Sequence, residues 1–171
     1  MKLQSEQIAQ FFDKGYLVVE NVFSPDDMAP VIAAYDKFIA QRAIEVKTQE
    51  KIQDIGEGLP FEKRFAALYA QSNEIEEDLD IMRARLEGMY NFLFNEKLLD
   101  VAESLLGGEI ISSPVQYIRA KIPTNIIADG VPHYIQNVPW HQNASVTLED
   151  ADPYNVFTFW IPLDTSKPAL F

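Results

Sequence analysis

The residue pattern of this chain changes once, near Gly107 and Gly108, and that change constrains its fold more than any other feature. Before the two glycines, apolar residues recur at the three- and four-residue spacing of amphipathic helices. After them, short runs rich in β-branched and aromatic residues alternate with segments that contain proline and glycine, a pattern typical of strands and turns. Helices followed by strands predict an α+β domain.

The first predicted helix begins at Ser5 and presents Ile8, Phe11 and Phe12 on one face. Gly15 stands where a left-handed C-cap would end this helix, and residues 16–22 then predict a strand.

A second helix is predicted to begin after Ser24, with Pro25 in its first position and Asp27 three residues after the cap. Pro30 should interrupt the hydrogen bonds of this helix and bend it, because proline has no backbone N–H. The mixed sequence over residues 47–65 predicts a loop that carries substrate-facing residues.

Two further helices are predicted, one over residues 75–94 and one from Asn95, a plausible N-cap, to the glycine pair. The acidic run that precedes and enters the first of them is interpreted as a solvated helix entry; it comprises Glu74, Glu76, Glu77, Asp78 and Asp80.

Strands are predicted over residues 110–111, 115–122 and 154–163. A jelly roll needs about eight strands, and the roughly sixty residues after Gly108 can supply about half of them. The pattern therefore predicts N-terminal helices packed on an incomplete double-stranded β-helix whose C-terminal strands are missing. Residues 1–108 would be mainly helical, and residues 109–171 would form the first strands of the barrel.

Composition narrows the function classes. A chain of 171 residues with 47% apolar residues suits one domain, residues 1–171. The absence of cysteine excludes disulfides, thiolate catalysis and iron–sulfur ligation. A net charge of -12 argues against a nucleic-acid partner. With no basic, apolar leader and no long apolar run, we expect a cytoplasmic protein without a membrane partner.

The chain has two histidines, His133 and His141, and the second has an amide two residues away, Asn143. On an extended strand these two side chains point to the same side, so they can approach one cation together. Two ligands do not hold a metal, and non-haem Fe(II) oxygenases use two histidines and one carboxylate. Judged from this pair alone, the alternative to a metal ligand is that His141 is a histidine satisfied by local hydrogen bonds at a strand end.

Three spaced blocks stand out in the second half of the chain: SPVQYIRAK at 113–121, VPWHQ at 138–142 and VFTFWIPLD at 156–164. Two more lie near the start, FFDKGYLVV at 11–19 and FSP at 23–25. In order and spacing, the first three resemble the central segments of the phytanoyl-CoA dioxygenase family, and the last two are similar to that family's opening. The resemblance spans nearly the whole chain and is weakest between residues 40 and 95. It implies a dioxygenase that uses Fe(II) and 2-oxoglutarate to hydroxylate an unactivated carbon of a small-molecule substrate.

The resemblance also assigns positions. His141 falls on the proximal histidine ligand of the iron, and Asn143 falls on its carboxylate ligand. Lys121 aligns with a lysine that reaches toward 2-oxoglutarate, Trp160 with an aromatic wall of the pocket, and Gln116 is placed in the same cavity. Strand alternation puts Gln116 and Lys121 on opposite faces, so both can point inward only if a bulge intervenes.

Two departures concern the metal. Asn143 replaces a charged carboxylate by a neutral carbonyl oxygen, a poorer donor to a hard cation, so weaker iron binding is expected. The family's distal histidine and its 2-oxoglutarate arginine lie downstream of the 156–164 block, so the chain is expected to be C-terminally truncated. His133 lies upstream and is interpreted as a surface histidine.

Three hypotheses follow. The first is an oxygenase of this type, incomplete or degenerate as given. The second is a non-catalytic small-molecule-binding protein that has lost the redox site, which the altered ligand at Asn143 favours. The third is a homodimer in which two half-barrels cover each other's strand edges.

Overall fold

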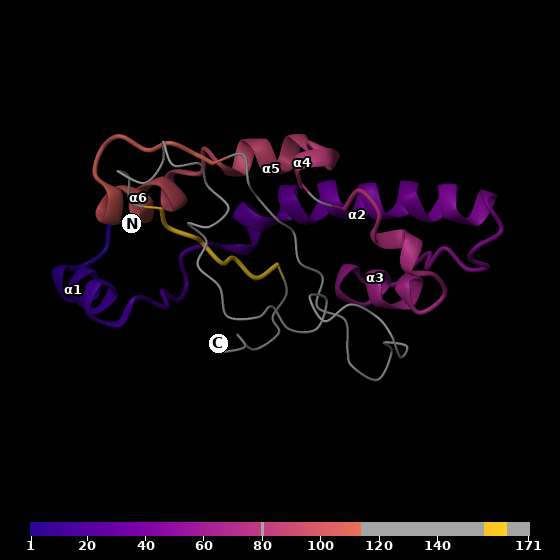
Figure 1. Ribbon diagram of the computed structural model, residues 1–171, viewed down its shortest axis with the longest axis horizontal. Helices are drawn as coiled ribbons and strands as arrows, with labels where there is room; N and C mark the ends of the chain where they lie inside the picture. Colours follow the sequence, from indigo (N-terminus) through magenta and orange to yellow (C-terminus); the bar gives the residue numbers. More distant parts are fainter. Residues whose placement is uncertain (80, 114–155, 164–171) are drawn as a thin grey trace.

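The computed structural model describes residues 1–79, 81–113 and 156–163, and its regular elements there are all helical. In chain order they are α1 (Ser5–Lys14), α2 (Pro25–Thr48), α3 (Phe61–Tyr69), the 3₁₀ helix η1 (Asn73–Glu76), α4 (Ile81–Ala84), α5 (Glu87–Phe92) and α6 (Glu96–Leu106). The long helix α2 is the axis of this arrangement, with α3 near its C-terminal end, α5 alongside it, and α1 and α6 near its N-terminal end (Figure 1).

The predicted α+β class is wrong, because the described residues contain no strand and no sheet. The predicted strands at residues 16–22 and 110–111, and the described part of the third at 156–163, form neither strand nor helix. The predicted strand at 115–122 lies outside the described residues. A strand forms only where its backbone pairs with a neighbour, and a β-type run of side chains indicates fit to a half-buried surface without supplying that pairing. The prediction was helices packed on an incomplete jelly roll. Over the described part of the chain, the helices instead pack on one another.

The first two helices confirm the predicted end signals. Gly15 adopts a φ of 78°, and its N–H donates to the carbonyl oxygen of Phe11 at 2.8 Å. The Ser24 N–H donates to Asp27 Oδ2 at 2.7 Å, and the Asp27 N–H donates back to Ser24 Oγ at 3.4 Å, which completes a capping box. α2 continues unbroken through Pro30 to Thr48.

One face of α2 carries the core. Its buried residues are Val31, Tyr35, Ile39, Ala43 and Val46, spaced three or four positions apart. They form one apolar cluster with buried side chains from the other helices and loops: Ile52, Phe65, Leu68, Tyr69, Ile75, Leu79 and Phe92. Full burial of one such aliphatic side chain stabilises a fold by about 1.5–3 kcal/mol, so this face accounts for the central position of α2.

α5 approaches α2 closely because it carries a glycine at the contact. A Cβ added to Gly88 would lie 2.6 Å from the carbonyl oxygen of Pro30 and 2.9 Å from the Cβ of Ala34. Both distances are shorter than packed atoms tolerate, so any side chain here would push the two helices apart.

The region between α2 and α6 differs in detail from the prediction. The predicted loop at 47–65 is shorter, since α2 extends to Thr48 and α3 begins at Phe61. The single helix predicted over 75–94 is divided into η1, α4 and α5, and the chain takes positive φ angles at Asp78 (64°) and Arg85 (44°). Such angles end a right-handed helix, and apolar spacing alone does not reveal them.

The final predicted helix is confirmed as α6. Its N-cap is Asn95, whose Oδ1 accepts the N–H groups of Lys97 at 2.9 Å and Leu98 at 3.4 Å. The helix ends at Gly107, which adopts a φ of 91°.

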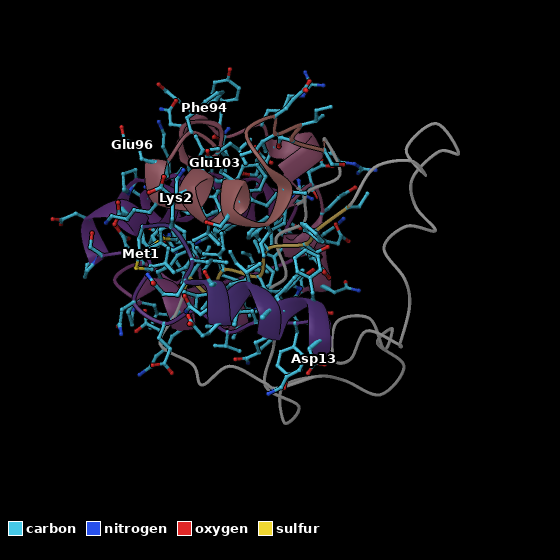
Figure 2. All side chains as sticks on the ribbon, turned by 90° about the vertical axis from the view of Figure 1, so that its left-hand side faces the viewer. Met1, Lys2, Asp13, Phe94, Glu96 and Glu103 are labelled. Carbon is cyan, nitrogen blue, oxygen red and sulfur yellow. The ribbon has the colours of Figure 1, made fainter. Side chains whose placement is uncertain are left out.

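The N-terminal residues fasten the start of α1 to α6. The Leu3 N–H donates to Ser104 Oγ at 3.0 Å, Lys2 pairs with Glu103 at 3.1 Å, and the amino group of Met1 contacts Asp100. Figure 2 shows Met1 and Lys2 beside the helix that bears Glu103. Since Leu3 is also buried, this end of α1 is anchored by polar and apolar contacts together.

Candidate functional site

Of the five predicted site residues, the structure describes Trp160. Gln116, Lys121, His141 and Asn143 lie outside the described residues, as does His133. Trp160 is 65% exposed and lies in segment 156–163, which is neither helix nor strand.

Exposure in segment 156–163 follows the period of two expected for an extended backbone. The even-numbered residues are exposed: Val156, Thr158, Trp160 and Pro162. On the odd-numbered side, Phe157, Ile161 and Leu163 are partly buried, and Phe159 is 37% exposed. Trp160 therefore belongs to the face of the segment that points away from the helices.

The opposite face attaches the segment to two parts of the helical body. Ile161 and Leu163 pack against the core cluster. Phe157 makes an edge-to-face contact with Phe11 of α1, with ring centroids 5.1 Å apart and planes at 89°. An edge-to-face pair of this kind contributes about 0.5–1.5 kcal/mol beyond the area it buries.

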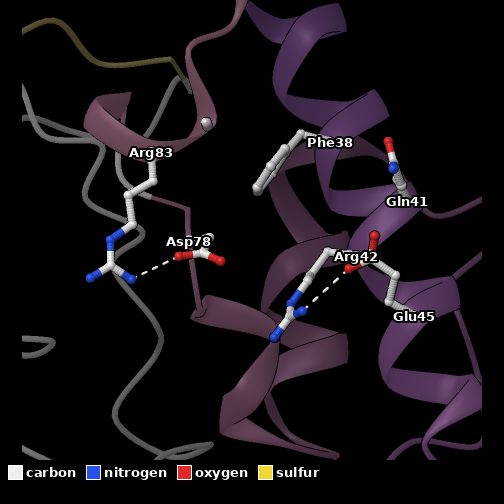
Figure 3. A pocket seen from close by; sticks show the side chains of 7 residues that line it. Phe38, Gln41, Arg42, Glu45, Asp78 and Arg83 are labelled. Atoms are coloured by element: carbon white, nitrogen blue, oxygen red, sulfur yellow. Dashed lines mark hydrogen bonds and ion pairs between the residues drawn. The ribbon is translucent and has the colours of Figure 1, made fainter.

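A hollow of about 440 Å³ lies elsewhere, between α2 and the α4 region (Figure 3). The residues lining it are Phe38, Gln41, Arg42, Glu45, Asp78, Arg83 and Ala84. Trp160 is not among them. Arg42, with a side chain 13% exposed, contacts Glu45 at 3.2 Å and Glu77 at 2.6 Å, and Arg83 contacts Asp78 at 2.7 Å. The guanidinium groups of Arg42 and Arg83 are thus both paired with neighbouring carboxylates, and we assign the hollow no ligand.

The acidic run before α4 is solvent-exposed at Glu77 and Asp78, and three of its carboxylates also make ion pairs. Glu74 pairs with Lys51, Glu77 with Arg42, and Asp78 with Arg83. Arg42 also donates to the carbonyl oxygen of Glu74 at 3.1 Å. The run joins the end of α2 to the turn around η1, so its function in the described residues is structural.

The pKa of the Asp27 carboxyl clearly departs from its usual value. Hydrogen bonds from Lys97, from the hydroxyl and backbone of Ser24, and from Asn95 hold the pKa of Asp27 far below the ordinary range, against a smaller opposing effect of burial. These partners all belong to the starts of α2 and α6. The perturbed carboxyl is therefore accounted for by helix capping.

The predicted substrate-facing loop is fastened over residues 53–56. The N–H groups of Gln53 and Asp54 both donate to Gln71 Oε1 at 3.0 Å, and Gln71 Nε2 donates to the carbonyl oxygen of Asp54 at 2.9 Å. Arg64 donates to the carbonyl oxygen of Ile55 at 3.4 Å. The contact of this loop with substrate stays a prediction.

The family model of phytanoyl-CoA dioxygenase (PhyH) matches residues 11–169, which is most of the chain. The chain belongs to the phytanoyl-CoA dioxygenase family. Comparisons with curated proteins and with solved structures returned no match.

Membership of the phytanoyl-CoA dioxygenase family confirms the resemblance and supports an oxygenase-type function that depends on Fe(II) and 2-oxoglutarate and acts on a small molecule. Within the described residues, no group of three or more His, Asp or Glu side chains could hold a metal ion. In that same part of the chain, no helix is long and apolar enough to cross a membrane.

Sequence reasoning missed what holds Trp160 in this phytanoyl-CoA dioxygenase family member. The Phe11 and Phe12 pair was assigned to one helix face, yet its aromatic partner, Phe157, is about 145 positions away in the sequence. The available signal was an apolar residue at every odd-numbered position of 157–163, which indicates the side of the segment that is covered but not what covers it.

Proposed function

We propose that this chain is a single domain, residues 1–171, of an Fe(II)- and 2-oxoglutarate-dependent oxygenase, incomplete or degenerate as given, in which His141 and Asn143 supply two of the iron ligands. Lys121, Gln116 and Trp160 bind 2-oxoglutarate. The observation that carries the proposal is the family match over residues 11–169, because it spans all five positions.

The donor chemistry fits iron in part. A histidine imidazole is an ordinary ligand of Fe(II), and the amide oxygen of Asn143 can also donate to a cation. Bound iron with 2-oxoglutarate would supply the oxidation of an unactivated carbon, while the protein binds and orients the substrate. Because Asn143 lacks the charge of a carboxylate, this pair should bind Fe(II) less tightly than His with Asp.

The exposure of Trp160 is compatible with its proposed place in the cosubstrate pocket. The helical body lies against the odd-numbered face of segment 156–163, so the indole on the even-numbered face remains accessible to a ligand. A flat aromatic side chain can form one apolar wall of a small-molecule pocket.

A second candidate is a non-catalytic small-molecule-binding protein of the same family. Asn143 is the observation that favours it, since a neutral residue at the carboxylate position weakens the metal site while leaving the pocket residues in place. For this candidate, we expect binding of a small-molecule ligand without turnover.

The deciding experiment measures Fe(II) binding by calorimetry under anaerobic conditions and 2-oxoglutarate decarboxylation by succinate release. The chain as given is compared with Asn143→Asp and with His141→Ala as the matched loss variant. The oxygenase proposal expects iron binding that strengthens in Asn143→Asp and disappears in His141→Ala. If neither the native chain nor Asn143→Asp binds iron above the His141→Ala background, the oxygenase proposal is rejected. Binding of 2-oxoglutarate, measured by the same calorimetry, without succinate release in either protein would favour the binding protein instead.

The homodimer stays a prediction, and its original basis in unfinished strand edges finds no support in the described residues, which contain no strand. Size-exclusion chromatography with light scattering tests it directly. A monomeric mass across a tenfold concentration range would reject it.

A further inference from the structure

Three aromatic rings join α1 to segment 156–163. Phe157 meets Phe11 with centroids 5.1 Å apart and Phe12 with centroids 6.5 Å apart, both edge to face. Phe11 and Phe12 also contact each other edge to face at 5.5 Å. The cluster is therefore closed, because each ring contacts the other two.

This cluster is the second attachment of α1. The helix has no buried residue of its own, and its N-terminal side is fastened to α6 through Leu3 and the residues before it. Near its C-terminal end, Phe11 and Phe12 contact Phe157. α1 thus connects α6 to the segment that carries Trp160.

The position of Phe157 matters because it lies three residues before Trp160 in an extended segment. In an extended backbone, residues an odd number apart point to opposite faces, so fixing Phe157 toward α1 turns Trp160 away from it. Ile161, on the same face as Phe157, packs against the core cluster on the other side of Trp160. The two contacts hold the backbone on both sides of the indole.

We propose that Phe157 is a positioning residue, through which α1 fixes the orientation of Trp160 for 2-oxoglutarate. This inference rests on the proposed function for the role of Trp160 in the cosubstrate pocket. The aromatic cluster itself stands on the contacts of Phe11, Phe12 and Phe157.

The test uses the full chain labelled with 5-fluorotryptophan, which gives two ¹⁹F resonances because the sequence contains two tryptophans. Trp160→Phe assigns the resonance of Trp160. Phe157→Ala and Phe11→Ala are both expected to shift or broaden that resonance. Phe94→Ala is the matched control, because it removes an exposed ring that pairs with Tyr90 and not with Phe157.

The affinity for 2-oxoglutarate is measured on the same proteins. Phe157→Ala and Phe11→Ala should each weaken it about two- to tenfold, the range expected when one edge-to-face contact is lost. Phe94→Ala should leave it unchanged. The double variant, Phe11→Ala with Phe157→Ala, should bind 2-oxoglutarate no more weakly than Phe157→Ala alone, because both changes break the same contact. Phe157→Tyr, which keeps the ring, should restore the affinity, and Phe157→Leu replaces Phe157→Ala if the alanine variant does not fold.

A Trp160 resonance unchanged in both Phe11→Ala and Phe157→Ala overturns the proposal. So does additive loss of affinity in the double variant. If 2-oxoglutarate fails to move the Trp160 resonance of the native chain, the positioning role falls together with the place of Trp160 in the pocket. Iron binding at His141, measured separately, would be untouched by that result, so the two failures are distinguishable.

Discussion

The side-chain amide of Asn95 donates a hydrogen bond to Asp27 Oδ1 at 3.1 Å, and this contact joins the start of α6 to the first turn of α2. Both residues take part in helix capping. Asp27 closes the capping box of α2 with Ser24, and Asn95 accepts the first N–H groups of α6. Lys97 contacts the same carboxylate, so one anion serves the N-termini of two helices, where the helix dipoles favour negative charge.

Stability should fall in acid through Asp27. Its pKa is lowered in the folded protein, so its contribution is fully present above the unfolded pKa of about 3.9 and is lost as pH falls toward the lower folded value. Urea unfolding of native protein and Asp27→Asn at pH 7, 5 and 3 checks this. Native protein should be the more stable at pH 7, and the difference should shrink at pH 3. Asp26→Asn, one position earlier in the same helix turn, is the control. A difference independent of pH would contradict the prediction.

Gly88→Ala should destabilise the fold by about 1–3 kcal/mol, the usual cost of overpacking, because the new Cβ meets the Pro30 carbonyl and Ala34. Helix propensity alone predicts the opposite sign, a gain of about 1 kcal/mol. Thermal and urea denaturation decide between them. Gly108→Ala is the matched control, since a Cβ there meets nothing within 4 Å. Increased stability of Gly88→Ala would show that α5 can move away from α2 at no cost.

Arg42→Lys should destabilise by about 1 kcal/mol, because an ammonium cannot reproduce the planar fork that reaches two partners at once. The fork contacts Glu45 and Glu77, and Arg42 also donates to the Glu74 carbonyl, with its side chain 13% exposed. Arg83→Lys, at a side chain 69% exposed, should change stability by less than about 0.5 kcal/mol. Equal effects of the two substitutions in urea unfolding would refute the importance of the Arg42 fork.

Gln71→Ala should release the loop between α2 and α3. Its amide accepts from the N–H groups of Gln53 and Asp54 and donates to the Asp54 carbonyl, so its removal leaves those groups to water. Hydrogen–deuterium exchange should accelerate at residues 53–54 and stay unchanged in α6. Gln41→Ala, at an exposed position of α2, provides the comparison. Unchanged exchange at residues 53–54 would mean that other contacts hold the loop.

How much of the fold could be predicted from the sequence depended on how far apart the contacting residues lie in the chain. The ends of α1, α2 and α6 were predicted from Gly15, Ser24 and Asn95, because a cap is a contact between residues a few positions apart. The breaks at Asp78 and Arg85 were missed, because their positive φ angles carry no apolar signature. For the candidate site, the sequence supplied five positions through family resemblance, and the structure describes one of them, Trp160.

By itself, the sequence determined the family and the capped helix ends, since both are specified by motifs or by local spacing. Only the tertiary structure decided that the β-type runs of the described residues form no sheet. It alone also showed that Gly88 sets the approach of α5 to α2, and that Phe157 meets Phe11. Strand pairing, close packing and aromatic contacts join residues that are distant in the chain. Local propensity does not identify such partners.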